Sequence, residues 1–429
     1  MRRTTLCLTL ALLATSCLAS APVYADAAWE ACLATPKRGC VFDEALYVAQ
    51  TLKDEVIRAM ALADVAAAQS KAGLAKEAAA NIAPAMQALQ SVDDKRRDWL
   101  LARIVRAQTS AGEFQEGLAT AQSVKDTQQR VVALGGIAAA QQGAGLTQEA
   151  AATFEQAIGA AQSLAEDPLV FALLYVAEAQ MNAKLKMPAA VTLDLAVQAA
   201  QTRKQHGMLL FVAQAQAKAG EFAEATEVAR SDEDTFSSLG LLAVVVAEAQ
   251  GGKLAEATEL AQLIPYPPAH ISALAAVAVA QVKAGFAMEG AGLLVEARRL
   301  AQSLPSGAGS ARALADVAGA LAAAGYGKES TTLFGQAIQA AQSLADVFQR
   351  DEELKNIAAL LAKSSKAAEA IGLAQSIKDQ FPRSVALDAI ADVQEQAGKW
   401  SEALRTTQAM DDALRRVDRL AEIAPKLPN

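Results

Sequence analysis

The chain has 429 residues, a net charge of −8, and a composition that is 53% hydrophobic but only 4% aromatic; alanine makes up about a quarter of it. A disordered chain would be poorer in apolar residues, and an aromatic-rich β-sandwich would carry more Tyr, Phe and Val, so both classes are excluded. The negative charge argues against a nucleic-acid-binding protein, and two histidines leave no material for a multi-histidine metal site.

Residues 1–25 have the features of a secretory signal peptide. Arg2 and Arg3 give the positive start, residues 6–19 form an apolar stretch, and small residues lead to a cleavage site after Ala25. Cleavage there removes two arginines and no acid, so the net charge of the mature chain changes from −8 to −10. We therefore expect a periplasmic or secreted protein, with no transmembrane segment in the mature chain.

An alternative for the N-terminus is a lipoprotein signal with the acyl chain on Cys17. The residues before this cysteine loosely resemble a lipobox, but Ala14 stands where leucine is usual. This alternative would anchor the mature protein to a membrane surface through lipid.

The mature chain keeps two cysteines, Cys32 and Cys40. In an oxidising compartment a lone pair eight positions apart predicts a disulfide, which would stabilise the fold by about 2.5 kcal/mol. A redox-active pair is the alternative, although such pairs usually have the Cys-x-x-Cys spacing. We expect the disulfide to hold the first repeat unit, which would have no neighbour on one side.

Internal repeats account for most of the remaining sequence. A motif such as Gln216–Gly220 recurs, and four positions after its glycine come glutamate and a small residue. A second motif, Ala-Gln-Ser, ends many of the repeat units. Alignment on these motifs gives turn positions at residues 73, 112, 145, 184, 220, 252, 285, 325, 365 and 398. Lys184 and Ser365 replace glycine at two of these turns.

The segment between each turn and its closing motif has one of two lengths, which differ by seven residues. Seven residues make nearly two helical turns, so an insertion of that length returns the apolar face of a helix to almost the same direction. A strand or loop has no reason to prefer this number. The sequence therefore predicts an all-α fold, an α-solenoid (right-handed superhelix) of about ten helix-turn-helix repeats of 33 or 40 residues.

Local residue choices agree with this prediction. Glycine before the second helix can end the first helix in a left-handed conformation. Glu77 and its equivalents fall in the first turn of the second helix, where a carboxylate suits the positive end of the helix. Pro84 is the exception, because it lies inside a long second helix, and it should kink this helix or delay its start.

The pattern resembles the tetratricopeptide repeat family over roughly residues 43–420. The resemblance rests on Val212, Ala213, Gln216, Gly220, Phe222 and Ala225, and on Ile390, Ala391, Gln394, Gly398, Trp400 and Ala403. Glutamine stands where that family usually has an aromatic residue, and the unit length is not constant. The resemblance implies a right-handed superhelix with a groove that binds proteins or peptides, and no catalytic chemistry.

The expected organisation has three parts. These are a signal peptide at 1–25, an N-terminal capping segment with the disulfide at 26–42, and a tetratricopeptide-like solenoid at 43–429. Repeats thus occupy nearly all of the mature chain and leave no room for a catalytic domain.

Two rows of polar residues recur at fixed repeat positions. One is a row of glutamines at residues 69, 108, 141, 180, 216, 281 and 394. These side chains could line a ligand groove, but we favour a structural role in which they form hydrogen bonds between neighbouring hairpins. The other is a row of cations that could bind an acidic peptide or an anionic polymer; it consists of Arg58, Arg130, His270, Arg350, Arg383 and Arg416.

The arginines of the second row also have a structural interpretation. Each has an aspartate four positions earlier, at residues 54, 126, 346, 379 and 412. Such spacing favours local ion pairs of about 0.3–0.5 kcal/mol each, which would neutralise the row. We favour this use, and we keep partner binding by the six residues as the alternative.

Other candidate sites are weak. His206 and His270 lie far from any cysteine or acidic cluster at ligand spacing, so no metal site is predicted. Residues 325–330 superficially resemble a phosphate-binding loop, but the first glycine is misplaced and no strand precedes it. No cofactor is expected, and an enzyme is the least favoured interpretation.

The function that we predict is protein binding by an adaptor or assembly scaffold in the cell envelope, with a protein or peptide partner. The alternative is a binder of cell-wall polysaccharide or exopolysaccharide, and lipid on Cys17 would favour it. No nucleic-acid partner is expected from the charge.

Overall fold

The protein is described by a computed structural model that covers residues 27–165, 167–202, 206–231 and 235–429. The predicted signal peptide and Cys17 therefore lie outside the described residues. Every regular element in the described part of the chain is helical, which confirms the all-α prediction. Within this part, no helix combines the length and apolar character needed to cross a bilayer.

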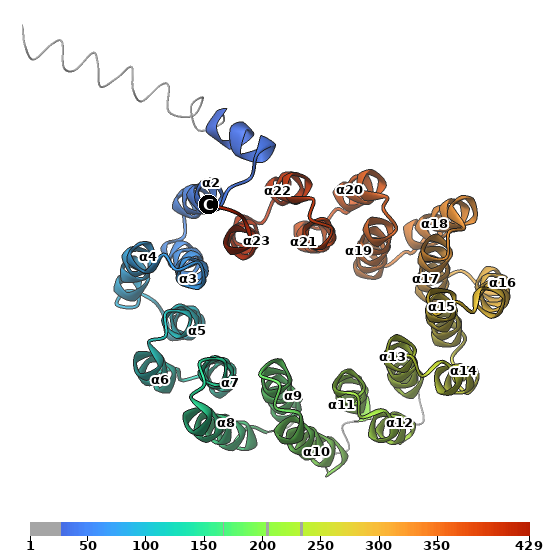
Figure 1. The fold of residues 1–429 in the computed structure, drawn as a ribbon, viewed down its shortest axis with the longest axis horizontal. Helices are drawn as coiled ribbons and strands as arrows, with labels where there is room; N and C mark the ends of the chain where they lie inside the picture. The colour runs from blue at the N-terminus through green and yellow to red at the C-terminus, as the bar shows by residue number, and fades with distance from the viewer. Residues whose placement is uncertain (1–26, 166, 203–205, 232–234) are drawn as a thin grey trace, which may run out of the picture.

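The helices form two concentric layers around an open centre (Figure 1). The inner layer consists of α3 (Glu55–Lys71), α5 (Asp94–Ser110), α7 (Thr127–Gly143), α9 (Asp167–Asn182), α11 (His206–Ala219), α13 (Thr235–Gln250), α15 (Pro267–Lys283), α17 (Ala308–Ala323), α19 (Val347–Lys363), α21 (Gln380–Gln396) and α23 (Ala413–Ile423). The outer layer consists of α2 (Arg38–Thr51), α4 (Ala75–Ala88), α6 (Phe114–Gln122), α8 (Thr147–Gln162), α10 (Lys186–Thr202), α12 (Phe222–Arg230), α14 (Leu254–Gln262), α16 (Ala287–Ser303), α18 (Gly327–Gln342), α20 (Ala367–Ser376) and α22 (Trp400–Gln408).

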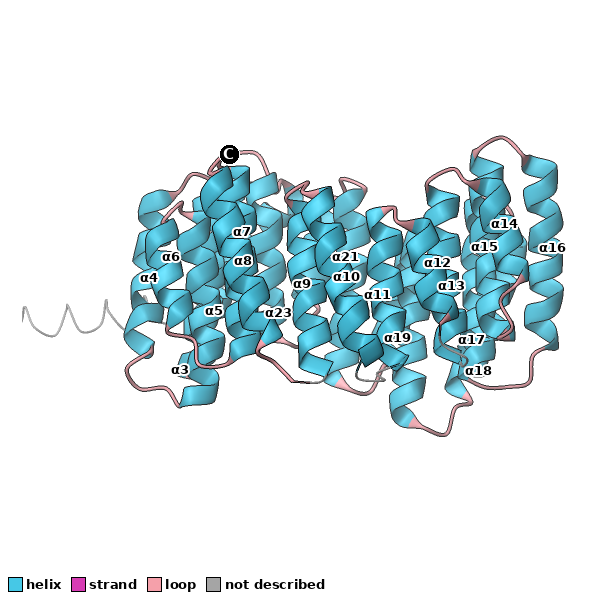
Figure 2. Ribbon diagram, turned by 90° about the horizontal axis from the view of Figure 1, so that it is seen from below, coloured by secondary structure: helices cyan, strands magenta, loops and turns pink. Residues whose placement is uncertain are grey.

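The helices stand side by side, so the molecule has two rims (Figure 2). We call the rim that carries the turns inside the hairpins the turn rim, and the opposite one, which carries the links between hairpins, the connector rim. Each inner helix from α3 to α21 packs against the outer helix that follows it. The predicted helix hairpins are thus confirmed.

All ten predicted turn positions have a positive φ angle. Eight are glycines, and the two substitutes, Lys184 and Ser365, have φ angles of 63° and 61°. Backbone bonds support each turn; at the first, the Leu74 amide donates to the Gln69 carbonyl at 2.9 Å. This hydrogen bond is typical of a helix that ends in a left-handed backbone conformation. Glycine is favoured at the turn because it adopts that conformation readily.

Nine of the outer helices have one of the two expected lengths. Five have 9 or 10 residues (α6, α12, α14, α20 and α22), and four have 16 or 17 (α8, α10, α16 and α18). The other two, α2 and α4, have 14 residues each, and α4 contains Pro84, which does not delay the start of this helix. The short and long helices both end near the connector link, as an insertion of about two turns allows.

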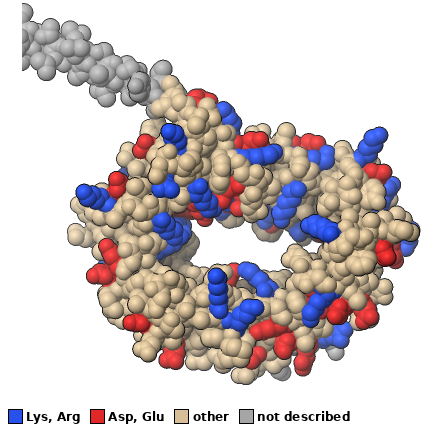
Figure 3. Space-filling model, viewed as in Figure 1, with Lys and Arg blue, Asp and Glu red and all other residues tan. Residues whose placement is uncertain are grey.

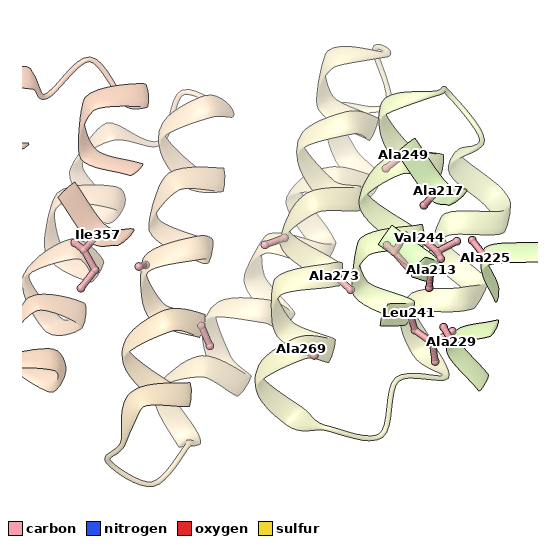
Figure 4. Close-up of a cluster of buried hydrophobic side chains, with 14 of the residues drawn as sticks. Ala213, Ala217, Ala225, Ala229, Leu241, Val244, Ala249, Ala269, Ala273 and Ile357 are labelled. Atoms are coloured by element: carbon pink, nitrogen blue, oxygen red, sulfur yellow. The ribbon is translucent and has the colours of Figure 1, made fainter. Parts of the chain in front are cut away.

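Alanine permits the close contact between the two layers. Ala213 of α11, Ala225 of α12 and Val244 of α13 are fully buried in one cluster (Figure 4). At Gly290 of α16 the approach is closer still, since an added Cβ would lie 2.7 Å from the Ala278 carbonyl oxygen. Small side chains thus replace the aromatic bulk that this chain lacks.

The solenoid closes into a ring through its two ends. The outer helix α2 packs on the last inner helix α23, and α23 packs on α3 (Figure 1). The eleventh hairpin is therefore split: its inner helix comes from the C-terminal end of the chain and its outer helix from the N-terminal end. We call the contact of α2 and α3 with α23 the seam.

Apolar side chains from both ends form the core of the seam. Leu33 and Phe42 are buried in one cluster with Val417 and Leu420. The Arg38 amide donates to the Pro428 carbonyl at 2.8 Å, which ties the start of α2 to the C-terminal end. The first unit was expected to lack a neighbour on one side; the seam supplies that neighbour.

The predicted disulfide joins Cys32 and Cys40. Cys32 lies in the helical segment 27–34, and Cys40 lies in the first turn of α2 rather than at a hairpin turn. The disulfide therefore fixes the segment 27–34 to one of the two helices that close the ring.

Candidate binding site on the inner wall of the ring

The inner wall is built from one face of each inner helix. In α9 and α11 this face carries residues about 13, 9, 6 and 2 positions before the hairpin turn at the end of the helix. These positions are three or four residues apart, so they lie on one side of a helix. The space-filling view shows that the opening at the centre is not filled by side chains (Figure 3). Two pockets lie on this wall.

The larger pocket has a volume of about 980 Å³ and lies between α13, α15, α17 and α19. Its apolar lining consists mainly of small residues, such as Ala276, Val279 and Gly319, together with three leucines (Leu242, Leu254 and Leu360). Small residues here leave space next to the helix backbone, and bulkier side chains at the same positions would fill it. The pocket could accept the apolar side chains of a partner.

The polar side chains of this pocket fall into two groups, one farther from the turn rim (Ser272 and Asp316) and one at that rim (Gln250, Lys283, Lys363, Ser364 and Ser365). The Ser272 hydroxyl donates to Oδ2 of Asp316 at 2.6 Å. Burial raises the pKa of the Asp316 carboxyl above its usual value, against the opposite effect of the hydrogen bond from Ser272. Lys283 and Lys363 lie where α15 and α19 end, at the turn rim.

The smaller pocket, of about 340 Å³, lies between α9 and α11 and is aromatic. The rings of Phe171 and Phe211 have centroids 5.4 Å apart and are tilted by 56°. Tyr175 lies beside them, and burial raises the pKa of its hydroxyl. The Lys218 ammonium donates to Oε1 of Glu178 at 2.7 Å. Such a surface can stack on the planar or apolar groups of a ligand.

Trp99 extends the aromatic character of the wall to α5. It lies 13 residues before its turn, as Phe171 does in α9, and 57% of its surface is exposed. An indole with that exposure in a chain so poor in aromatic residues is available to a partner.

A charged cluster covers the wall at the seam. Asp64 of α3 is fully buried and is bound by Arg103 and Arg106 of α5. Arg103 Nη1 also donates to Oδ1 of Asp418, in α23, at 3.1 Å. Burial raises the pKa of Asp64 to about 8, against the opposite effect of the two arginines. This cluster links three inner helices and leaves little free charge.

The row of cations singled out in the sequence lies at the connector rim, away from both pockets. Three of its arginines donate from Nη1 to a carbonyl six residues earlier, namely Arg58 to Leu52 at 2.9 Å, Arg130 to Val124 at 2.9 Å and Arg383 to Ile377 at 2.7 Å. They thus satisfy carbonyls where an outer helix ends.

The other three members have different contacts. His270 Nδ1 lies 2.8 Å from the Ala261 carbonyl oxygen, and Arg350 Nε lies 3.6 Å from Oδ1 of Asp351. Arg416 donates to Glu44 across the seam at 2.7 Å. Partner binding by the six residues stays a prediction, and a partner would compete with these internal contacts.

The expected ion pairs between the arginines and the preceding aspartates do not form among these described residues. The aspartates instead cap the inner helices: Asp126 accepts from the Gln129 amide at 2.9 Å, and Asp346 accepts from the Gln349 amide at 2.8 Å. A capping aspartate points along the helix axis to free amides, so it does not face the side chain four residues later.

The recurrent glutamines are largely buried between the layers rather than displayed to the opening. Thr192 and Thr406 donate to the amide oxygens of Gln180 and Gln394 at 2.8 and 2.7 Å. Both bonds stay inside one hairpin, whereas we expected bonds between hairpins. Gln281 does bond to the preceding hairpin, through Thr258 at 3.4 Å.

Within the described residues, no group of three or more His, Cys, Asp or Glu side chains could hold a metal ion. His206 begins α11, and His270 is bonded to backbone as described above. The geometry of the wall is suited to binding a ligand through apolar contacts and charge.

Sequence reasoning missed both pockets and the charged cluster at the seam. The signal for the large pocket was present as alanine and glycine at the inner-face positions of α15 and α17. Alanine is so common throughout the chain that these positions did not stand out.

Comparisons with known proteins give only distant likenesses. No family model matches the chain, and no curated protein matches it. Among solved structures, it is similar to Ton1535 from Thermococcus onnurineus NA1, at 17% identity over 83% of this chain and 98% of that one, with a TM-score of 0.31. It is also similar to Rap protein complexed with competence and sporulation factor, at 10% identity, 75% and 99% coverage and a TM-score of 0.32.

A third solved structure is a circular tandem repeat protein with novel repeat topology, at 12% identity, 89% coverage of this chain and 97% of that one, with a TM-score of 0.17. These structural similarities are too distant to assign a function to the chain. The function has to come from its own residues.

Proposed function

We propose that this chain, a helical-repeat protein whose hairpins close into a ring, is an exported adaptor that binds a segment of a partner protein on its inner wall. The observation that carries the proposal is the pair of pockets that share this wall, one lined mainly by small apolar residues with lysines at its rim, the other aromatic. A partner segment laid along the wall could fill both, because α11, which lines the aromatic pocket, packs against α13, which lines the apolar one. The role is binding rather than catalysis.

Export to the cell envelope is the second part of the proposal. It rests on the signal-like residues 1–25 and on the disulfide between Cys32 and Cys40, since disulfides persist in oxidising compartments. Mass spectrometry of the mature protein tests it. The proposal is supported if the mass corresponds to a chain that begins at Asp26 and is two hydrogens lighter because of the disulfide. An uncleaved chain with free thiols contradicts it.

The binding function is tested by filling the large pocket. Ala276→Phe places an aromatic ring on the pocket floor, and Ala152→Phe is the matched control on the exposed face of α8. We expect a partner from envelope extract to be retained by the wild-type protein and the control and to be lost from Ala276→Phe. Equal retention by all three proteins would place the interaction elsewhere, and no retained partner would count against an adaptor.

Polysaccharide binding remains the second candidate function. The observation that favours it is the exposure of Trp99 together with the ring pair of Phe171 and Phe211, because aromatic faces can stack on sugar rings. Affinity electrophoresis in gels containing cell-wall polysaccharide would detect it, and substitution of Trp99 by alanine should then restore the mobility.

A further inference from the structure

Cations gather around the opening at the turn rim, although the chain as a whole is acidic (Figure 3). The same repeat position, two residues before the turn, carries Lys71, Lys218, Lys283 and Lys363. Arg106 lies on the inner face of α5 one turn earlier. We call these five residues the lysine collar.

Helix polarity accounts for the sign of the charge in the lysine collar. The inner helices end at the turn rim, where a cation is favourable, and the outer helices begin there, where a carboxylate such as Glu289 or Glu329 is favourable. One rim therefore has basic residues around the opening and acidic residues toward its outside. The cations of the lysine collar would therefore favour an anionic ligand at the opening.

Three members of the lysine collar have no ion pair. Arg106 binds Asp64 and Lys218 binds Glu178, but Lys71, Lys283 and Lys363 are not within ion-pair distance of an acidic side chain in the described residues. At Lys71, burial lowers the pKa of the ammonium group, and the charges of Arg106 and Lys426 lower it further against the opposite effect of Glu422. A ligand with carboxylates would relieve this repulsion.

We propose that the lysine collar binds an acidic stretch of a partner polypeptide, whose neighbouring apolar side chains occupy the large pocket. This inference rests on the proposed function and names the chemistry of the partner segment. Lys283 and Lys363 both line the large pocket, so carboxylates bound there lie next to its apolar floor.

The lining of the pocket favours a polypeptide over an anionic polysaccharide. Sugar hydroxyl groups need hydrogen-bond partners when they are buried, and away from the turn rim the lining is mainly alanine, valine, leucine and glycine. The polar pair on the floor, Ser272 and Asp316, is already bonded to itself. Apolar side chains beside carboxylates match this surface better.

The test uses the full mature protein and a fluorescein-labelled peptide of alternating glutamate and leucine, with binding followed by fluorescence anisotropy. Lys283→Gln with Lys363→Gln removes the two unpaired cations that line the large pocket. Lys76→Gln with Lys328→Gln, on exposed positions of α4 and α18 at the same rim, removes the same charge from the outer layer. We expect the first pair of substitutions to weaken binding about fivefold to thirtyfold, and the control pair less than about twofold. Added salt should weaken wild-type binding.

Three outcomes would overturn the inference. The labelled peptide does not bind, both variants lose affinity equally, or polygalacturonate binds while the peptide does not. These results are separable from a failure of the proposed function. If Ala276→Phe loses the envelope partner but Lys283→Gln with Lys363→Gln keeps it, the inner wall is still the binding site and only the acidic character of the partner is wrong.

Discussion

The hairpin at the seam and the hairpin of α17 and α18 have the same arrangement of an inner and an outer helix but are held together differently. The helices α17 and α18 share a turn at Gly325, and this turn fixes their relative position. The helices α23 and α2 share no turn and come from opposite ends of the chain. At the seam, therefore, side-chain burial, ion pairs and the hydrogen bond between Arg38 and Pro428 must do what the turn does elsewhere.

This difference predicts that substitutions at the seam act on the shape of the molecule as well as on its stability. In a continuous hairpin, a lost contact leaves the two helices tethered. At the seam, a lost contact allows the ring to open, because stacked repeats contact only their neighbours. The predictions below separate the two effects.

The largest effect is expected from a charge in the core of the seam. Leu420 is 1% exposed, and Leu420→Asp should reduce the free energy of unfolding by about 3–4 kcal/mol, since a carboxylate would be buried without a partner. Leu333→Asp in α18 should cost a similar amount. Urea denaturation measures both, and small-angle scattering should show a larger radius of gyration for the seam variant alone.

A ring that keeps its radius of gyration in Leu420→Asp would show that the seam is not needed for closure. Val295→Asp, on the exposed face of α16, is the control for the added charge and should change stability by less than about 0.5 kcal/mol.

Loss of the disulfide should have the next largest effect. Replacing Cys32 and Cys40 by alanine removes the constraint on a short loop in the unfolded chain, which should reduce stability by about 2.5 kcal/mol. Urea denaturation with and without reductant checks this, because reductant should destabilise the wild-type protein and leave the variant unchanged. A wild-type protein insensitive to reductant would contradict the prediction.

The charged cluster at the seam should make stability depend on pH. Burial raises the pKa of Asp64 to about 8 from the usual 3.8, so the folded state holds a proton that the unfolded state has lost between these values. Stability from this group is therefore present at low pH and is lost as the pH rises toward 8. The asparagine side chain in Asp64→Asn does not titrate. The free energy of unfolding of this variant should therefore fall about 1–2 kcal/mol less between pH 5 and 8 than that of the wild-type protein.

Exposed Asp43, in α2, provides the control for this pH experiment. Asp43→Asn should leave the pH dependence as it is in the wild-type protein. Asp316 titrates in the same direction in all three proteins, so its contribution cancels in the comparison. An unchanged pH profile in Asp64→Asn would mean that Asp64 stays ionised throughout.

The hairpins could be predicted from sequence because their signals are local. A turn needs a residue that tolerates a positive φ angle, so its position can be read from glycine and from the two residues that replace it, Lys184 and Ser365. The two lengths of the outer helices follow from helical periodicity in the same way. Each of these features depends on a few neighbouring residues.

Ring closure and the inner wall could not be predicted, because they depend on contacts between distant parts of the chain. Small rotations between neighbouring hairpins accumulate along a solenoid, and the sequence does not give their sum. The aspartates were misassigned for a different reason. Asp126 lies outside the helix that carries Arg130, so the spacing rule for side chains on one helix did not apply to it.

The smallest effect is expected at a turn inside a continuous hairpin. Lys184 has a φ angle of 63°, which costs a residue with a Cβ atom about 1–2 kcal/mol, partly offset because glycine loses more freedom on folding. Lys184→Gly should therefore stabilise the protein by about 0.5–1 kcal/mol, as measured by thermal or urea denaturation.

Gly325→Ala, the reverse change, should destabilise it by about 1 kcal/mol. No heavy atom lies within 4 Å of a Cβ added at Gly325, so the loss would come from backbone conformation alone. The seam has no turn residue of this kind, and equal stability of both variants and the wild-type protein would show that the turns do not distinguish the continuous hairpins from the split one.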